Sequence, residues 1–404
     1  MVALEATVSG ALYIVSALVL AVLASASFVA PQEENSSRVN FLSKAACLLA
    51  AFLIVALLAL AVQGAKLSGG ALPSIDILAR YVTRTQSGGL WLWREAYAAL
   101  LLVLVLSFRN SAAQDRIARW LFLIAVPLVA SRALSSHAAA VRENNGIAIA
   151  IDALHLIVSA LWAGGLPVLF WLLWRRNRDL SAPLGWAAGL VVRFSRLALA
   201  SVAVIIATGL YQSWLQLQSW SALVETAYGR VLLLKLALFA SMLALGALNR
   251  CSTKPALLKA AASESLPAKA LRRIGAEAAL AVGVFCVTGF LTVQPPGAHS
   301  QHRLAAASQS APTPAAGVEI KILSPREGDV VHGDQVPIVF RMTGGKSGYH
   351  AHAYVDGELM GMFETRNGTL TGIAPGAHTL ELRIVAADHQ TELDASDRIH
   401  FVVK

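Results

Sequence analysis

The first three quarters of the chain alternate between long apolar runs and short polar segments. Helices in a bilayer need roughly 20 apolar residues to cross a hydrocarbon core about 30 Å thick, and they satisfy their own backbone polar groups. The apolar runs predict membrane-spanning helices at 8–30, 41–63, 89–108, 117–138, 146–173, 186–215, 231–249 and 273–294. We therefore expect residues 1–294 to form an all-α polytopic membrane bundle of about eight spans.

The pattern changes after residue 294. Residues 295–316 are rich in Pro, Ser and Ala, which is typical of a linker. Beyond them, short runs such as VEIKIL and HTLELRIV alternate apolar and polar positions, and turn signals separate them at Asp356-Gly357, Asn367-Gly368 and Pro375-Gly376. Residues 317–404 are therefore predicted to form a small all-β sandwich of immunoglobulin-like type on the extracytoplasmic side.

Composition and charge support this interpretation. Hydrophobic residues make up 56% of the chain and charged residues only 14%, against about 25% in ordinary soluble domains. The net charge is +9, and the basic residues concentrate in the connections after the first, third, fifth and seventh spans, as at Arg175, Arg176 and Arg178. The positive-inside rule places these loops in the cytoplasm and both termini outside it. Positive charge thus indicates topology in an inner membrane, and we expect no nucleic-acid partner.

Five ordered segments resemble the copper resistance protein D family. They are SHAAA at 136–140, DALHLIVSALWAGGL at 152–166, RFSRLALASVAVIIATGL at 193–210, YGRVLLLKLALFASMLALGALNR at 228–250, and the eighth span with its closing QPP. The resemblance implies movement of copper across the inner membrane, with uptake from periplasm to cytoplasm as the expected direction. It implies a copper ion as ligand, either Cu(I) or Cu(II), and a periplasmic copper-binding protein as a candidate partner.

Asp152 and His155 lie inside the fifth apolar run. They are three residues apart and so share a helix face, although an aspartate at mid-helix costs about 2.5–3.5 kcal/mol to insert. His137 falls at the outer end of the fourth span, and Asp152 and His155 fall in the outer half of the fifth, so all three are expected near the outer leaflet. We interpret His137 and His155 as copper ligands, with Asp152 orienting a ring or adding charge. The alternative is a polar contact that holds two helices together.

Other intramembrane residues are candidates for a pathway. Met242 and Cys286 carry soft sulfur suited to Cu(I), but either could simply fill a packed core. Glu277 and Lys235 are pathway charges or local ion-pair partners, and Lys235 could instead extend to the membrane surface. The paired glycines after Trp162 are predicted to let neighbouring helices approach closely.

The β domain has its own candidate metal site. His350 and His352 alternate along one strand and should point to one face. Met360 and Met362 repeat that spacing beyond the Asp-Gly turn, so a hairpin would bring them alongside, and a His–Met set suits copper. The alternative is a polar sheet surface with ordinary core methionines.

Functions of three classes are compatible with these features. The first is a copper permease, which we expect not to be an enzyme; because the sequence has no phosphate-binding loop, we expect no ATP hydrolysis. The second is an electron-transfer protein with haem between His137 and His155. The third is a copper sensor or assembly factor that uses the β domain to bind a partner.

Overall fold

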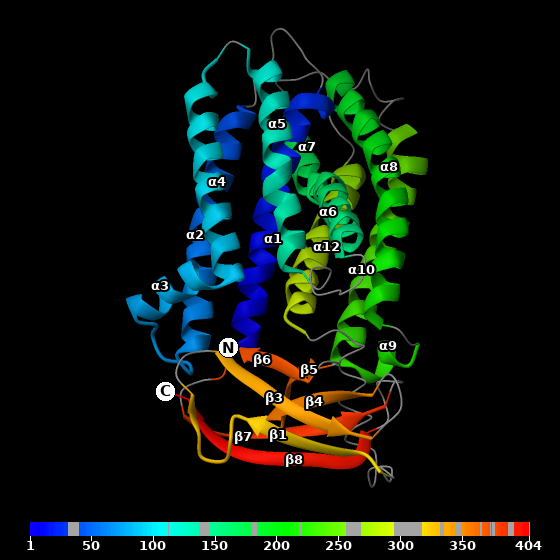
Figure 1. The fold of residues 1–404 in the computed structure, drawn as a ribbon. Helices are drawn as coiled ribbons and strands as arrows, with labels where there is room; N and C mark the ends of the chain where they lie inside the picture. Colours follow the sequence, from blue (N-terminus) through cyan, green and yellow to red (C-terminus); the bar gives the residue numbers. More distant parts are fainter. Residues whose placement is uncertain are drawn as a thin grey trace. The chain divides into compact units, whose positions relative to one another are not determined.

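We analysed a computed structural model of the chain (Figure 1). The structure describes residues 1–30, 40–111, 113–136, 145–179, 184–217, 220–255, 268–294, 317–331, 335–344, 349–363, 366–371, 373, 376–386 and 392–403. The chain divides into two compact units, Met1–Ala298 and His299–Lys404. We call them the membrane unit and the β unit.

The described part of the membrane unit is built from helices joined by short irregular segments. Its elements are α1 (Val2–Ala24) with the π-helical extension η1 (Ser25–Val29), α2 (Phe41–Leu67), α3 (Ile75–Arg84), α4 (Gln86–Phe108), α5 (Gln114–Ala130) with the 3-10 turn η2 (Ser131–Ser135), α6 (Asn145–Trp162), α7 (Gly165–Asp179), α8 (Leu184–Leu217), α9 (Ala222–Glu225), α10 (Ala227–Leu248) with η4 (Asn249–Thr253), and α12 (Ala268–Thr292). Within the described residues, eight helical segments are long and apolar enough to cross a membrane, α6 and α7 together forming one of them. The predicted bundle of eight spans is confirmed.

Aromatic side chains mark both ends of this bundle. Eight of the nine tryptophans lie toward the ends of the membrane spans or just beyond them, and the ninth, Trp162, lies inside the span Gly146–Arg178. One set comprises Trp91, Trp93, Trp214 and Trp220, and the opposite set comprises Trp120, Trp171, Trp174 and Trp186. Tryptophan rings favour the membrane–water interface because they combine an apolar body with a polar N–H group. The two sets therefore mark where the bilayer surfaces meet the bundle.

Helix α1 lies at the centre of the unit and packs against α2, α5, α6, α7 and α12 (Figure 1). Its closest crossing is with α12, where a Cβ atom on Gly289 would collide with the α1 backbone at Ala6 and Gly10. Ser9 and Thr292 also hydrogen-bond side chain to side chain across this crossing, with 3.1 Å between their oxygens. Small residues allow such close approach in membranes, where helix association depends on packing.

The fifth span is broken, which the hydropathy pattern did not predict. Helix α6 ends at Trp162 and α7 begins at Gly165. A Cβ atom on Gly164 would lie 3.0 Å from Ala17 of α1, and one on Gly165 would lie 2.6 Å from the ring of Phe194 in α8. The two glycines therefore bring three elements together, as the predicted packing role requires, and they also interrupt the helix.

The short helix α3 is a second feature that the sequence reading missed. It is strongly amphipathic and has no buried residue. The hydroxyl of Ser74 caps it by accepting from the N–H of Ile77, with 3.4 Å between the two atoms. Its ten residues are too few to cross a bilayer, so a search for long apolar runs passes over it.

The β unit is a sandwich of two sheets. Its strands are β1 (Glu319–Ser324), β2 (Val330–Val331), β3 (Gln335–Thr343), β4 (His350–Val355), β5 (Glu358–Phe363), β6 (Asn367–Thr371), β7 (Gly376–Val385) and β8 (Glu392–Val403). One sheet has the order β1-β3-β6 and the other β2-β8-β7-β4-β5, antiparallel except where β2 pairs with β8. Ile338 and Phe340 from the first sheet and Leu380, Leu382 and Phe401 from the second belong to one buried core.

The predicted turns had different outcomes. Asp356 and Gly357 have φ values of +50° and +83° and join β4 to β5, which confirms the Asp-Gly hairpin. Asn367 and Gly368 were predicted to form a turn, but they begin strand β6, so that prediction is wrong. A Cβ atom at Gly368 would overlap the ring of Phe363, so this glycine makes room for an aromatic side chain.

Candidate functional site

A polar cluster lies between α6, α8 and α10 of the membrane unit. Asp152 and His155 come from α6, Thr208 from α8, and Tyr228 and Lys235 from α10. Asp152 is 8% exposed and Thr208 is 7% exposed. The start of α6, the end of α8 and the start of α10 lie at one end of the bundle because consecutive spans alternate in direction. The cluster therefore occupies the half of the bundle near that end.

The hydrogen bonds of His155 determine which ring nitrogen carries its proton. Its Nδ1 lies 2.9 Å from the hydroxyl oxygen of Thr208. That hydroxyl donates its single proton to the carbonyl oxygen of Val204, at 2.7 Å. The arrangement that satisfies both contacts has the oxygen of Thr208 accepting from the Nδ1–H group of His155, and we assign this tautomer. Nε2 then has a lone pair, the form in which neutral imidazole binds a metal ion.

Charges surround this histidine. Lys235 interacts electrostatically with both Asp152 and His155, and Asp152 also interacts with Tyr228. The electrostatic attraction between Lys235 and Asp152 acts between helices α10 and α6. The cluster thus combines one histidine, one carboxylate and one cation in the interior of a membrane bundle, where unpaired charge is costly.

The other predicted members are distributed differently. His137 lies outside the described residues. Met242 is 1% exposed and lies in the core on α10, seven residues from Lys235 and therefore about 10 Å from it along the helix. Cys286 lies on the exposed surface of α12, so its side chain points away from the bundle core. Among described residues, no group of three or more His, Cys, Asp or Glu side chains is arranged to hold a metal ion.

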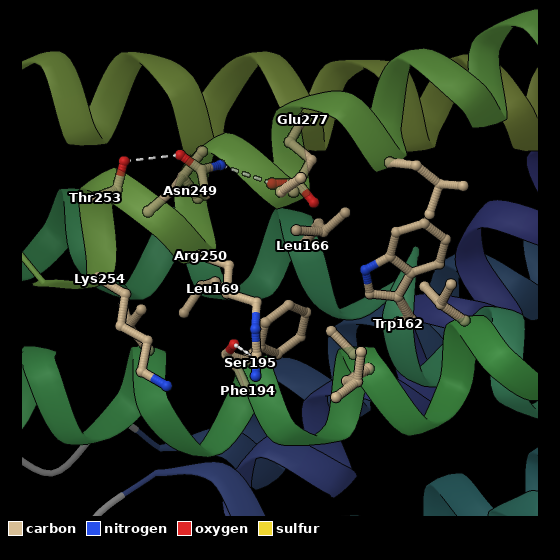
Figure 2. Close-up of a pocket in the computed structure, with 18 residues that line it drawn as sticks. Trp162, Leu166, Leu169, Phe194, Ser195, Asn249, Arg250, Thr253, Lys254 and Glu277 are labelled. Atoms are coloured by element: carbon tan, nitrogen blue, oxygen red, sulfur yellow. Dashed lines mark hydrogen bonds between the residues drawn. The ribbon is translucent and has the colours of Figure 1, made fainter.

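A second polar cluster lies toward the opposite end of the same helices (Figure 2). Glu277 of α12 is 4% exposed and accepts a hydrogen bond from Nδ2 of Asn249, at 2.8 Å. Thr253 donates to Oδ1 of Asn249, at 2.9 Å. Glu277, Asn249 and Thr253 all line a cavity of about 240 Å³ whose walls are mostly apolar. From Lys235 to Asn249, α10 and its continuation η4 rise about 20 Å, which separates the two clusters.

The β unit brings its two candidate histidines into contact. Nε2 of His350 and Nε2 of His352 are 3.1 Å apart. Two nitrogens at that separation, each about 2.0 Å from a shared metal ion, give an angle at the metal of about 100°, close to tetrahedral. The two residues are 1% and 4% exposed. The pair therefore shares one face, as predicted, and is buried there, whereas the alternative was a polar sheet surface.

The methionines lie beside this pair with different exposures. Met362 is directly opposite His352 in the β4–β5 ladder. Met360 falls where the register of that ladder shifts, and it is 37% exposed. The hairpin therefore places Met362 next to the histidines, as predicted, and leaves Met360 nearer to solvent.

Charged residues continue the same face of the sheet. Arg383 of β7 pairs with His352 across the ladder and stacks on the ring of Tyr354, at 4.7 Å. Glu381 accepts from Arg383 and Arg398 at 2.7 and 2.6 Å. Burial alone would raise the pKa of Glu381, but these two hydrogen bonds outweigh it and hold the pKa below its ordinary value. The carboxylate therefore stays ionised beside the histidine pair.

Sequence reasoning missed Thr208 and Asn249, each of which orients a predicted residue. Thr208 interrupts an apolar run and shares a helix face with Gln212, four residues later. The Nε2 atom of Gln212 is buried and has no hydrogen-bond partner among the described residues. Two polar residues four positions apart within an apolar span could have indicated a polar helix face at Thr208. Asn249 falls at the end of its apolar run, where a polar residue is ordinary and gives no signal.

Comparison with known proteins agrees with the sequence resemblance. Residues 188–291 match copper resistance protein D, and residues 6–147 match the N-terminal domain of copper resistance protein D-like proteins. The membrane unit belongs to the copper resistance protein D family. Thr208, Lys235 and Glu277 lie inside the first of these matches, whereas Asp152 and His155 lie between the two.

Two curated relatives are similar over part of this family member. The copper transport protein CutJ of Bacillus subtilis is 34% identical over 175 residues, covering 42% of this chain and 31% of the relative. The inner membrane protein YebZ of Escherichia coli is 29% identical over 213 residues, covering 49% of this chain and 66% of the relative. The chain thus spans less than two thirds of the length of either relative.

One set of solved structures is similar to the β unit only weakly. The fibronectin(III)-like modules of CbhA from Clostridium thermocellum are 20% identical, covering 21% of this chain and 95% of the module, with a TM-score of 0.18. This score is too low to assign a fold, so the immunoglobulin-like topology stays a prediction.

Proposed function

We propose that this protein carries copper across the inner membrane and that His155 is a copper ligand on the path. The observation that supports the proposal is the hydrogen bond from Nδ1 of His155 to Thr208, which leaves Nε2 as a lone-pair donor inside the bundle. The name of the similar protein CutJ supports copper as the substrate. Because the chain spans less than two thirds of either relative, copper transport by the whole protein is also a proposal.

The chemistry of dehydration explains the residues in the cluster. A copper ion that enters an apolar bundle loses its hydration water, and nitrogen from an imidazole can replace one water molecule. Asp152 offsets the charge of the ion, which a site of low dielectric constant cannot leave unpaired. Lys235 balances Asp152 while the site is empty. Arrival of copper therefore substitutes one cation for another beside the same carboxylate.

Orientation follows from the charge of the loops. We propose that the basic end of the bundle, with Arg175 and Arg178, faces the cytoplasm and that both termini lie outside it. The cluster around His155 then lies in the outer half, where copper from a periplasmic copper-binding protein would reach it first, and we propose that copper moves inward. A reporter that is active only in the cytoplasm and is fused after Lys404 will stay silent, and a strong signal would reverse the orientation.

Copper accumulation in cells tests the role of His155. We expect His155→Ala to reduce uptake to near background while the protein still inserts, because removing an intramembrane polar group makes insertion easier. Asp152→Asn keeps the shape and loses the charge, so it will weaken uptake less completely. Ser159→Ala, one turn further along α6, is the matched control and will leave uptake within about twofold, since changes away from a site have small effects.

Each rate is normalised to the amount of folded protein in the membrane. If the cluster only packs helices together, His155→Ala will lower the folded yield and leave uptake per folded molecule unchanged, and the proposal is then rejected. A visible spectrum of the purified protein distinguishes the haem alternative, because a Soret band with no bound copper would contradict copper transport.

A further inference from the structure

The cavity lined by Glu277 lies between α8 on one side and α10 with α12 on the other (Figure 2). Helix α8 packs chiefly against α6, and α10 packs chiefly against α12, so α8 and α10 belong to different packed pairs. Two lining residues, Leu199 of α8 and Ala247 of α10, are exposed on the surface of the membrane unit. Exposed apolar side chains on a membrane-spanning helix face lipid. The cavity therefore opens sideways toward the acyl chains of the bilayer.

The interior of the cavity is apolar. Its lining at the end farthest from Lys254 includes Trp162, Leu166 and Val202 (Figure 2). Apolar walls that face an empty space lose dispersion contacts, so a chain that enters from the side and fills the space stabilises the bundle. The volume of about 240 Å³ lies below the range of about 300–1,000 Å³ that is typical of pockets for drug-sized ligands. It therefore has room for a segment of one acyl chain.

The other end of the cavity carries two cations. Arg250 lies at the end of the span Ala227–Thr253, and Lys254 follows this span directly. This is the basic end of the bundle, where the tryptophan set that includes Trp174 marks the bilayer surface. Arg250 donates to the hydroxyl of Ser195 at 3.2 Å, and no carboxylate in the described part of the chain forms an ion pair with Arg250 or Lys254. Both cations are thus available to an anion at the level of the lipid headgroups.

An apolar interior with a cationic mouth fits an amphipathic anion. A phosphate group can accept hydrogen bonds from a guanidinium and attract an ammonium, and basic pockets between membrane helices bind lipid headgroups. Glu277 is the single acidic residue of the lining, so the net charge of the lining is positive whether or not Glu277 is ionised. A zwitterionic lipid would bring an ammonium group of its own, which Arg250 and Lys254 repel.

We propose that this cavity binds phosphatidylglycerol, an anionic phospholipid, from the leaflet at the basic end of the bundle. One acyl chain enters the apolar interior between α8 and α10, and the phosphate lies at Arg250 and Lys254. A lipid held in this way contacts both helices, so it stabilises the folded membrane unit. The inference goes beyond copper transport and does not depend on it.

Lipid titrations of the purified full chain in detergent test this site, with native mass spectrometry to count the lipids that the protein retains. The probes are phosphatidylglycerol and phosphatidylcholine with identical acyl chains. We expect retention of one phosphatidylglycerol at a concentration roughly 10-fold lower than that needed for phosphatidylcholine. Arg250→Gln combined with Lys254→Gln should weaken retention of phosphatidylglycerol by roughly 10- to 30-fold and leave retention of phosphatidylcholine unchanged. Phosphatidylglycerol should also raise the thermal unfolding midpoint of the unchanged protein more than that of this double variant.

Arg193→Gln combined with Arg196→Gln is the matched control. It removes two exposed arginines from the basic end of α8 that lie outside the cavity lining, and retention of phosphatidylglycerol should stay within about twofold. Ala198→Phe places a ring in the cavity and leaves both cations, so it should weaken retention of both lipids. Ala247→Leu is a smaller change of the same kind and serves as the test if Ala198→Phe does not fold.

Four results would overturn the proposal. Equal retention of the two lipids would remove the role of the cations. An equal loss in the control variant would show that general basic charge at this end attracts the lipid. Unchanged retention in the folded cavity-filling variants would place the acyl chain elsewhere. A dimer without bound lipid would show that a second copy of the chain covers this face.

Discussion

Replacing Thr208 by valine tests the link between a single hydrogen bond and copper affinity. Valine keeps the shape of threonine and removes the hydroxyl that accepts from Nδ1 of His155 at 2.9 Å. The metal-binding form of the ring would then bury an unsatisfied N–H group, at a cost of about 1–3 kcal/mol. The ring can avoid that cost by moving its proton to Nε2, but that nitrogen can then no longer bind copper. We therefore expect copper affinity at this site to fall by roughly 5- to 150-fold.

The dependence of uptake rate on copper concentration measures this effect. The half-saturating concentration should rise by the factor given above, while the maximal rate per folded molecule changes little, because Thr208→Val leaves Asp152 intact. Thr208→Ser is the control, since it retains a hydroxyl that can accept from His155 and will stay near the unchanged protein. A half-saturating concentration within twofold of normal in Thr208→Val would refute the proposed tautomer and its role.

Two further predictions concern the β unit. Combining His350→Ala with His352→Ala should remove about one equivalent of bound copper from the full chain, as measured by metal analysis. The double variant should also have a lower thermal unfolding midpoint, because both side chains are buried. Full copper content in the double variant would exclude this site. Hydrogen bonds from His378 and from the N–H of Thr379 hold the pKa of Asp356 below its ordinary value. The ionised carboxylate therefore stabilises the folded protein above about pH 4, and this stabilisation is lost as pH falls through the lowered pKa. Asp356→Asn should therefore unfold at a lower temperature than the unchanged protein at pH 7. This difference in unfolding temperature should shrink by about pH 3, and a difference that does not depend on pH would contradict the assignment.

Properties that depend on local periodicity could be predicted from the sequence. The eight spans follow from apolar runs because a helix in lipid must be long, apolar and satisfied within itself. The Asp-Gly hairpin follows from the positive φ values that its two residues tolerate. The shared face of His350 and His352 follows from the two-residue period of a strand. These rules need no knowledge of which segments meet.

Pairings between distant segments were decided by the tertiary structure. Thr208 meets His155 across 53 residues and Asn249 meets Glu277 across 28, and no local pattern states which helices will be neighbours. The burial of His350 and His352 likewise does not follow from the two-residue period of their strand. The sequence by itself determined that polar groups lie in apolar helices, and only the packed bundle decided which of them are hydrogen-bonded, which are balanced by charge, and which face a cavity. The physical reason is that an intramembrane polar group is stable only with a partner, and packing chooses the partner.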